Sequence, residues 1–517
     1  MRCKGELLEL GSSQRGTKHM RREEQSLRRG QGYLLAIAAI LGTLTQGVVS
    51  QEPAEPPLGQ SVWTFDVLYL KNGAKFQGLL VAEEPDGYVF RVVLRRPGRP
   101  TSTLTTFFVK GEVQRLQRLS ESERAALRDR LAELDPSGQG EQQRMEAVEL
   151  VTEDWPGLPG QARRYESEHF ILISTGSEEL TRRTAVRLEQ LYTAFVRFFP
   201  PQVNDAVPTR IWLAVSEEEY RLLLRSLNLP PLLNPALYEP RSNQIVCGSS
   251  WRELGQQLQT ARVHHSQHLA ALARQEMELR RLYRRPELDR HLAVLERERK
   301  RIYQAERLNT QQFETATARI FPLLYHEAFH AYIGTFVYPP LPIEQVRAGR
   351  GSGELPRWLN EGLAQIFESA VIEAGELRAD APQVERLHRV QDWLRGKEGG
   401  PLLPLHELLN AGPSLFATAH TNQKAQTHRA YLTSWALAYY LTFTRRRLTT
   451  PEFRNYLIAV NSGADPQQAF CDWVGQSLET FEREFHADLL RLQRNGRLMP
   501  RQDNPHPPGG ARRLSDE

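Results

Sequence analysis

Two histidines and a glutamate stand together beyond the middle of the chain, where residues 326–330 read His-Glu-Ala-Phe-His, an HExxH sequence. Residues four apart on a helix lie on one face, so His326 and His330 can reach the same ion. Imidazole is a common ligand of Zn²⁺, and a catalytic zinc site takes three protein ligands and leaves one position for water. The carboxylate of Glu327 is then placed to accept a proton from that water. The pattern predicts a zinc site in which Glu327 is the general base.

A third zinc ligand is expected from Glu361, which follows His330 after 30 intervening residues. Part of the intervening segment is rich in Pro and Gly, a composition typical of a loop that reverses the chain. A helix that begins near Arg357 can then lie antiparallel to the first helix and present Glu361 to the ion, which completes a His-His-Glu ligand set. Glu368 lies on the same helical face and is expected to orient the ligands. A purely structural role for Glu361 is the alternative.

The His-Glu-Ala-Phe-His sequence, followed by Trp358-Leu-Asn-Glu-Gly-Leu-Ala, resembles the gluzincin metallopeptidases, in particular the Asn-Glu-Gly segment of aminopeptidase N relatives. More closely, the whole run of residues 165–492 is similar to a family of exported bacterial proteins with a peptidase-MA-like domain. The resemblance implies that the two histidines and Glu361 bind zinc and that Glu327 acts as the base. The sequence contains no Gly-x-Met-Glu-Asn segment, with which aminopeptidase N relatives bind the amino terminus of a substrate. This favours an endopeptidase.

Gluzincins also supply a Tyr or His from a downstream helix, and that side chain stabilises the transition-state oxyanion. The helical segment 428–441 offers Tyr431 as the first candidate and His428 as the second. A packed ring whose hydroxyl is satisfied elsewhere is the alternative for Tyr431.

Another histidine pair, His264 and His268, has the same spacing without a Glu next to the first histidine, and a solvated surface pair is the favoured interpretation.

The elements that precede this site predict strands first and helices later. Residues 61–118 contain five short runs of strand-forming residues, and Asn72-Gly73 is a strong signal for a two-residue hairpin. These strands predict a small closed β-barrel of the SH3 or Sm-like type. Residues 252–318 are almost free of Gly and are broken once by Pro286, which predicts a long antiparallel helical hairpin.

The predicted fold class is α+β: a zincin-like catalytic domain with a long helical-hairpin insertion, preceded by the small barrel. The strand, helix and strand that come before the hairpin predict a twisted sheet against which the active-site helix packs. In chain order, the predicted divisions are a signal peptide (1–50), the β-barrel (61–118), a helix and linker (119–162), the αβ part of the zincin-like domain (163–251), the helical hairpin (252–318), the zinc-binding helical part (319–492) and a disordered tail (493–517).

The first fifty residues have the three parts of a secretory signal peptide. Arg28 and Arg29 precede an uncharged apolar stretch, and small residues stand before an expected cleavage point after Ser50. The sequence therefore predicts an extracytoplasmic protein, either periplasmic or secreted. An uncleaved membrane anchor is the alternative, and attachment to a membrane is expected only in that case.

The charge of the chain gives no indication of a nucleic-acid partner. Residues 1–50 hold eight basic and four acidic residues, which leaves 58 of each sign in the rest of the chain. A nucleic-acid-binding protein needs a concentrated basic surface, and nothing in this total requires one.

Cys247 and Cys471 are the two cysteines that follow the leader, and both a disulfide and two separate thiols remain open.

The predicted function is zinc-dependent hydrolysis of peptide bonds in a peptide or protein substrate, outside the cytoplasm, with Zn²⁺ as the cofactor. The first alternative is a non-enzymatic exported scaffold, in which the barrel or the helical hairpin docks a protein partner. A metal-dependent hydrolase that acts on non-peptide substrates is the second alternative.

Overall fold

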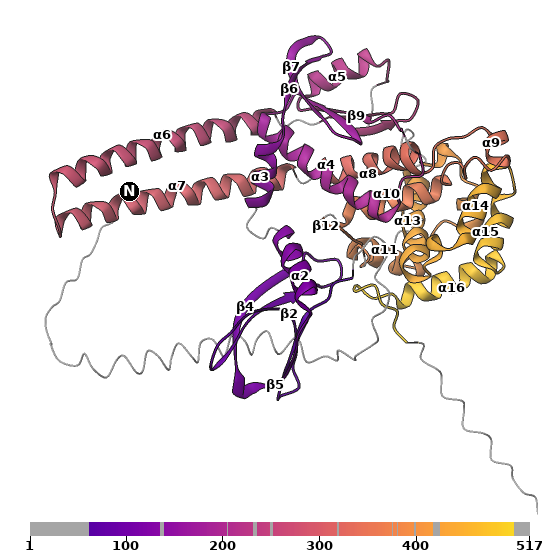
Figure 1. Cartoon of the computed structure of the whole chain (residues 1–517). Helices are drawn as coiled ribbons and strands as arrows, with labels where there is room; N and C mark the ends of the chain where they lie inside the picture. Colours follow the sequence, from indigo (N-terminus) through magenta and orange to yellow (C-terminus); the bar gives the residue numbers. More distant parts are fainter. Residues whose placement is uncertain are drawn as a thin grey trace, which may run out of the picture.

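The architecture is mixed α+β, as predicted: two β-sheets and a small β-hairpin are combined with many helices (Figure 1). The computed structural model describes residues 62–134, 139–203, 205–230, 235–248, 252–317, 320–374, 376–379, 381–397, 400–416 and 424–500. The predicted signal peptide lies outside the described residues, as does the predicted tail from residue 501 onward. Within these ranges, no helix combines the length and the apolar character that crossing a membrane requires.

Five antiparallel strands form an open sheet in the amino-terminal part of the described chain, in the order β4-β3-β2-β1-β5. The strands are β1 (Asp66–Leu70), β2 (Lys75–Glu83), β3 (Gly87–Leu94), β4 (Ser102–Val109) and β5 (Val113–Gln117). The predicted Asn-Gly hairpin is confirmed, because β1 pairs antiparallel with β2 and Gly73 between them has a φ of +84°. Glycine adopts this left-handed conformation without the steric cost that a side chain would add.

The predicted closed barrel is wrong, because β4 and β5 lie at opposite edges of this sheet and do not pair within the described residues. Neighbouring residues of a strand point to opposite faces, and the sheet has apolar residues on both. One face buries Leu68 and Phe90, whereas the other packs Leu79 and Val93 against helix α2 (Glu121–Glu133). A helix therefore covers the face that a closed barrel would leave to solvent.

A six-stranded sheet follows, in the order β10-β11-β9-β8-β7-β6. Its strands are β6 (Val151–Trp155), β7 (Leu158–Glu166), β8 (Phe170–Ser174), β9 (Thr209–Ala214), β10 (Ala236–Glu239) and β11 (Gln244–Gly248). Strands β8, β9 and β11 are parallel, and the other pairings are antiparallel. The sheet begins earlier than predicted, since β6 and most of β7 fall in the segment expected to be linker. Trp155 at the end of β6 is 1% exposed and packs edge-on against Trp212, which holds this extra hairpin in place.

Helices cover both faces of the six-stranded sheet (Figure 1). Helix α5 (Glu217–Ser226) buries Leu223 and Leu224 against the face that carries Trp212. Helix α4 (Glu178–Phe198) buries a long apolar stripe on the other face and also contacts α8 (Ile320–Tyr332), and helix α3 (Gln139–Ala147) packs beside α4. The face that carries α4 and α8 belongs to the largest apolar core of the chain.

The predicted helical hairpin is present as α6 (Arg252–Leu282) and α7 (Glu287–Thr317), which lie side by side and extend away from the rest of the protein (Figure 1). The predicted break at Pro286 is confirmed, because Pro286 lies in the turn between the two helices. Leu272, Leu295 and Ile302 form the buried contact between the helices. A rise of 1.5 Å per residue over the 31 residues of each helix gives a hairpin about 45 Å long.

The carboxyl-terminal part of the described chain is helical. After α8 come η2 (Ile333–Val337), α9 (Ile343–Arg347), α10 (Arg357–Ser369), the hairpin strands β12 (Val371–Glu373) and β13 (Glu376–Arg378), α11 (Val384–Leu394), α12 (Leu405–Leu409), η3 (Pro413–Phe416), α13 (Lys424–Tyr439), η4 (Tyr440–Thr444), η5 (Arg447–Thr449), α14 (Pro451–Asn461), α15 (Pro466–Val474) and α16 (Leu478–Arg491). Residues 493–500 of the predicted tail turn back beside α16, with a β-bridge between Leu492 and Leu498.

The amino-terminal sheet is tied to the helical part through the β12–β13 hairpin, which follows α10 directly. The Nε1 of Trp63 donates to Glu376 at 3.3 Å, and Arg95 forms an ion pair with the same carboxylate at 3.1 Å. The backbone N–H of Thr101 donates to Glu373 at 2.7 Å. Glu376 is 3% exposed, so these polar contacts belong to a largely buried interface rather than to a solvated surface.

Candidate metal centre

Helix α8 holds two imidazoles on one side because its other sides are apolar and buried. Leu324, Phe329 and Tyr332 are fully buried and pack against α4 and α10. The rings of His326 and His330 lie one turn apart, with centroids separated by 4.8 Å. The sequence prediction that these two side chains lie close together on one helix is therefore met by the geometry.

Helix α10 approaches the site closely because residue 362 has no side chain. A Cβ atom added at Gly362 would lie 2.4 Å from the carbonyl oxygen of Ser434 and 2.6 Å from the Cβ of Ala438, both on α13. Only glycine fits at that separation between two helices. The tight contact between α10 and α13 fixes the position of the preceding residue, Glu361, whose side chain is 1% exposed.

Three side chains converge where α8 faces α10. One ligand atom each from His326, His330 and Glu361 lies within 4.8 Å of the others, and this is the group of His, Cys, Asp and Glu side chains in the described ranges that could hold a metal ion. Glu361 Oε2 lies 3.3 Å from the Nε2 of His326, and Glu361 Oε1 lies 3.6 Å from the Nε2 of His330. Glu361 Oε2 is buried and has no hydrogen-bond partner among the described residues. A buried carboxylate oxygen without a partner is costly, and a cation shared with the two imidazoles would satisfy it.

The second ring nitrogen of each histidine is held by a side chain from α10. The Nδ1 of His326 lies 3.3 Å from Glu368, and the Nδ1 of His330 lies 2.9 Å from the amide oxygen of Asn360. These contacts turn both Nε2 atoms toward Glu361, which is the arrangement that metal-binding histidines require. The sequence indicated Glu368 but missed Asn360, although Asn360 stands directly before Glu361 in the chain.

Two arginines complete the charge balance around these carboxylates. Arg357 forms an ion pair with Glu361 at 2.6 Å, and Arg386 forms one with Glu368 at 3.1 Å. Burial would raise the pKa of Glu361, but His330, His326 and Arg357 outweigh burial and hold that pKa well below its usual range. Glu361 is therefore ionised, as a metal ligand must be.

The histidine that touches two carboxylates has a strongly shifted pKa. Burial opposes the charged form of His326, but the carboxylates of Glu361 and Glu368, each 3.3 Å from one of its ring nitrogens, outweigh burial and raise its pKa to about 10. In the absence of a metal ion, His326 therefore carries a proton at neutral pH. A metal must displace that proton, because only the neutral imidazole is a ligand.

A prediction about proton release follows from this shift. Zinc binding at pH 7.5 is expected to release roughly one proton per chain, and the affinity should rise with pH until the pKa of His326 is passed. Isothermal titration calorimetry in buffers of different ionisation enthalpy measures the number of protons released. Zinc binding that releases no proton would show that His326 is already neutral in the empty site.

Glu327 lies beside the three candidate ligands and is not one of that group. Its half-buried carboxylate accepts a hydrogen bond of 2.7 Å from the backbone N–H of Tyr238, on the edge strand β10. This contact fixes the carboxylate between α8 and the sheet without an ion pair among the described residues. This contact could not be predicted from the sequence, because Tyr238 stands 89 residues before Glu327.

The two candidates for an oxyanion donor lie on α13, and both are bonded to groups outside the candidate metal centre. The hydroxyl of Tyr431 donates to the carbonyl oxygen of Phe416 at 3.2 Å, and burial followed by the charge of Glu361 raises its pKa. His428 is exposed, and its Nε2 lies 2.9 Å from Arg389. His264 and His268 are exposed on α6, in agreement with a surface pair.

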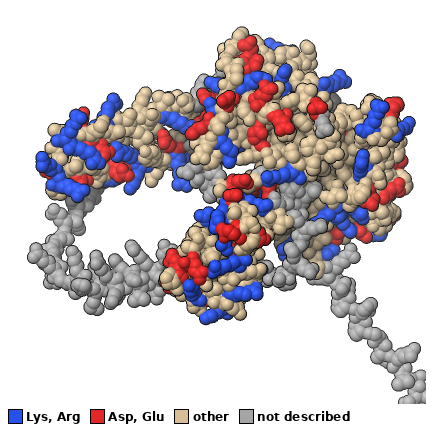
Figure 2. Space-filling view, viewed as in Figure 1, with Lys and Arg blue, Asp and Glu red and all other residues tan. Residues whose placement is uncertain are grey.

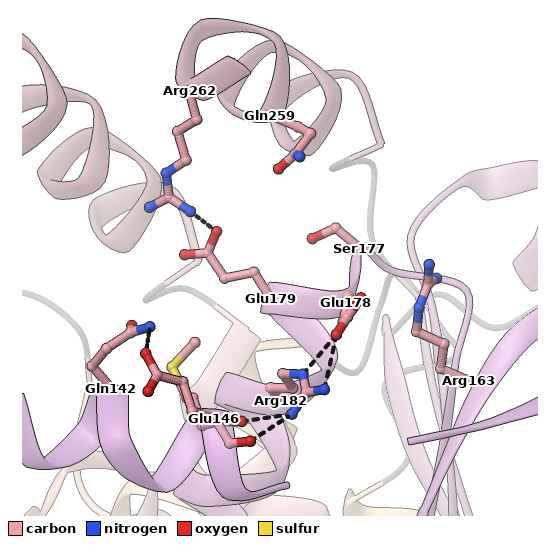
Figure 3. A pocket seen from close by; sticks show the side chains of 10 residues that line it. Gln142, Glu146, Arg163, Ser177, Glu178, Glu179, Arg182, Gln259 and Arg262 are labelled. Atoms are coloured by element: carbon pink, nitrogen blue, oxygen red, sulfur yellow. Dashed lines mark hydrogen bonds and ion pairs between the residues drawn. The ribbon is translucent and has the colours of Figure 1, made fainter. Parts of the chain in front are cut away.

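A separate hollow of about 620 Å³ lies between α3, the start of α4 and the start of α6 (Figure 3). Four of its charged groups form ion pairs with one another: Arg182 contacts Glu178, and Arg262 contacts Glu179. None of the three candidate metal ligands lines it.

Of the cysteines, Cys247 is a buried free thiol and Cys471 is a partly buried one, so they form no disulfide.

Comparison with known proteins relates one part of the chain to a family. Residues 348–461, which include all of α10 and α13, match the family described as "Protein of unknown function (DUF1570)". The matched segment contains Glu361 and Glu368, but it starts after the two histidines of α8. Comparison with curated proteins gave no match, and neither did comparison with solved structures.

Proposed function

We propose that this protein is an exported, zincin-like zinc metallopeptidase, and that it acts as an endopeptidase. The observation that carries the proposal is the convergence of two imidazole Nε2 atoms on Glu361, whose buried Oε2 has no hydrogen-bond partner among the described residues. Glu327 stands next to this group on the same helix and is free of ion pairs within the described ranges. This is the combination of ligands and base that metal-assisted hydrolysis requires.

Zinc bound to His326, His330 and Glu361 would lower the pKa of a water molecule and polarise a substrate carbonyl. Glu327 has the task of accepting the water proton at its carboxylate and delivering it to the leaving amine. The backbone N–H of Tyr238 keeps that carboxylate in place between turnovers. Asn360 and Glu368 keep the imidazoles oriented. Tyr431 is the proposed donor to the oxyanion, for which its hydroxyl must leave the carbonyl oxygen of Phe416.

Removal and restoration of the metal test this proposal. The purified protein is expected to hold about one zinc ion per chain and to cleave internal bonds of a mixed peptide substrate. A chelator should abolish cleavage, and about one equivalent of zinc should restore it, because the three ligands remain in the folded protein. Cleavage by the metal-free protein at the rate of the zinc-loaded protein would contradict the proposal.

A further inference from the structure

A cluster of arginines surrounds two larger side chains at the far end of the helical hairpin. Residues 280–285, which we call the tip segment, read Arg-Arg-Leu-Tyr-Arg-Arg and directly precede Pro286. No acidic residue interrupts this run. Basic and acidic residues balance over the chain after residue 50, so the tip segment is a local excess of positive charge on a body that is neutral overall.

The tip segment is open to solvent. All four of its arginines are exposed, and Leu282 is 75% exposed, the largest exposed fraction among the large apolar side chains of the described residues. Arg280 forms an ion pair with Glu276 and Arg285 lies 3.9 Å from Asp289, whereas Arg281 and Arg284 make no ion pair with any described residue. Figure 2 shows Lys and Arg gathered at this end of the hairpin, with fewer acidic side chains among them.

We propose that the tip segment docks this protein onto an anionic phospholipid surface. Arginines attract the negative headgroups, while an apolar side chain such as Leu282 enters the boundary between headgroups and acyl chains. Tyr283, which is partly exposed, has the amphipathic ring that such a boundary favours. A nucleic acid would pair with the arginines but would leave Leu282 without a partner, and the neutral body offers no continuation of a basic path.

The length of the hairpin determines how far the candidate metal centre would lie from a lipid surface. The tip lies about 45 Å from the base of the hairpin, and α7 leads into α8, which carries His326 and His330. Docking at the tip would hold the candidate metal centre at a distance from the lipid. Four arginines and one leucine form a peripheral contact that salt can reverse, not an anchor. The proposal does not depend on peptidase activity.

The test is co-sedimentation of the purified protein with vesicles. The parent is expected to bind vesicles that contain phosphatidylglycerol and phosphatidylcholine, to bind phosphatidylcholine vesicles far more weakly, and to be released by high salt. The double variant Arg281→Gln, Arg284→Gln should lose roughly 25-fold in affinity, since each basic residue near such a surface contributes roughly fivefold. Leu282→Ser should weaken binding while keeping its dependence on salt.

A matched control carries the same change of charge away from the tip. Arg274 and Arg307 are exposed on the two helices and, like the substituted pair, have no ion pair within the described ranges. Their double change to Gln should leave binding near that of the parent. The proposal is overturned if the parent does not prefer phosphatidylglycerol, or if the two double variants bind equally well. Circular dichroism of each variant shows whether the helices are retained.

Discussion

Replacing Glu327 with Gln is expected to abolish peptide hydrolysis while zinc content and fold stay unchanged. The amide has nearly the volume of the carboxylate, and its oxygen can still accept the hydrogen bond from the backbone N–H of Tyr238. The three candidate ligands are untouched. The amide cannot accept a proton from water, so no proton reaches the leaving amine. Loss of a general base costs roughly 10²–10⁴ in rate.

The measurement compares initial rates on one peptide substrate with the metal content of the same samples. Glu344 is exposed on α9, so Glu344→Gln makes the same chemical change away from the site and should retain the parent rate. Cleavage by Glu327→Gln at the parent rate would show that the metallopeptidase proposal is wrong. If neither parent nor variant cleaves any peptide and both hold zinc, a non-enzymatic scaffold becomes the better account.

The elements that the sequence predicted well are those set by local pattern. The helical hairpin follows from a long stretch of helix-forming residues with a single Pro286, and the first β-hairpin follows from Asn72-Gly73. Closure of a barrel depends instead on whether β4 pairs with β5. The pattern of strand-forming residues predicts the strands but not this pairing. The helix that covers the sheet was predicted, but its packing against Leu79 and Val93 is a contact between distant segments. The β6–β7 hairpin was missed, although Pro156-Gly157 is a turn signal.

The same division between local and distant information applies to the candidate site. The spacing of His326 and His330 on one helix is local, so the sequence predicted that they face one ion. Glu361 required only a chain reversal and a second helix. The groups that hold these side chains come from elsewhere: Tyr238 lies on the edge strand, and Arg386 lies on α11. Neither has a fixed spacing from the motif, which is why the sequence did not indicate them.

Replacing Glu361 with Gln is expected to cause the largest loss of zinc affinity among single glutamate changes around the site. The amide keeps the volume but lacks the charge that favours a divalent cation, and it is a poor zinc ligand. Loss of a residue that merely orients a ligand typically costs 10–100-fold in metal affinity, so loss of a ligand should cost more than about 100-fold. Competition with a chromogenic chelator measures the affinity.

A graded series separates a ligand from a residue that orients one. Glu368→Gln removes the carboxylate that contacts the Nδ1 of His326, and its loss should fall within roughly 10–100-fold. Glu385→Gln, at an exposed position of α11, should have no effect. Glu361 also raises the pKa of His326, so the Glu361→Gln variant should titrate this imidazole at lower pH than the parent, which NMR can follow in the metal-free protein. Zinc held by Glu361→Gln as tightly as by the parent would exclude Glu361 from the ligand set, even if its effect on the pKa of His326 were found.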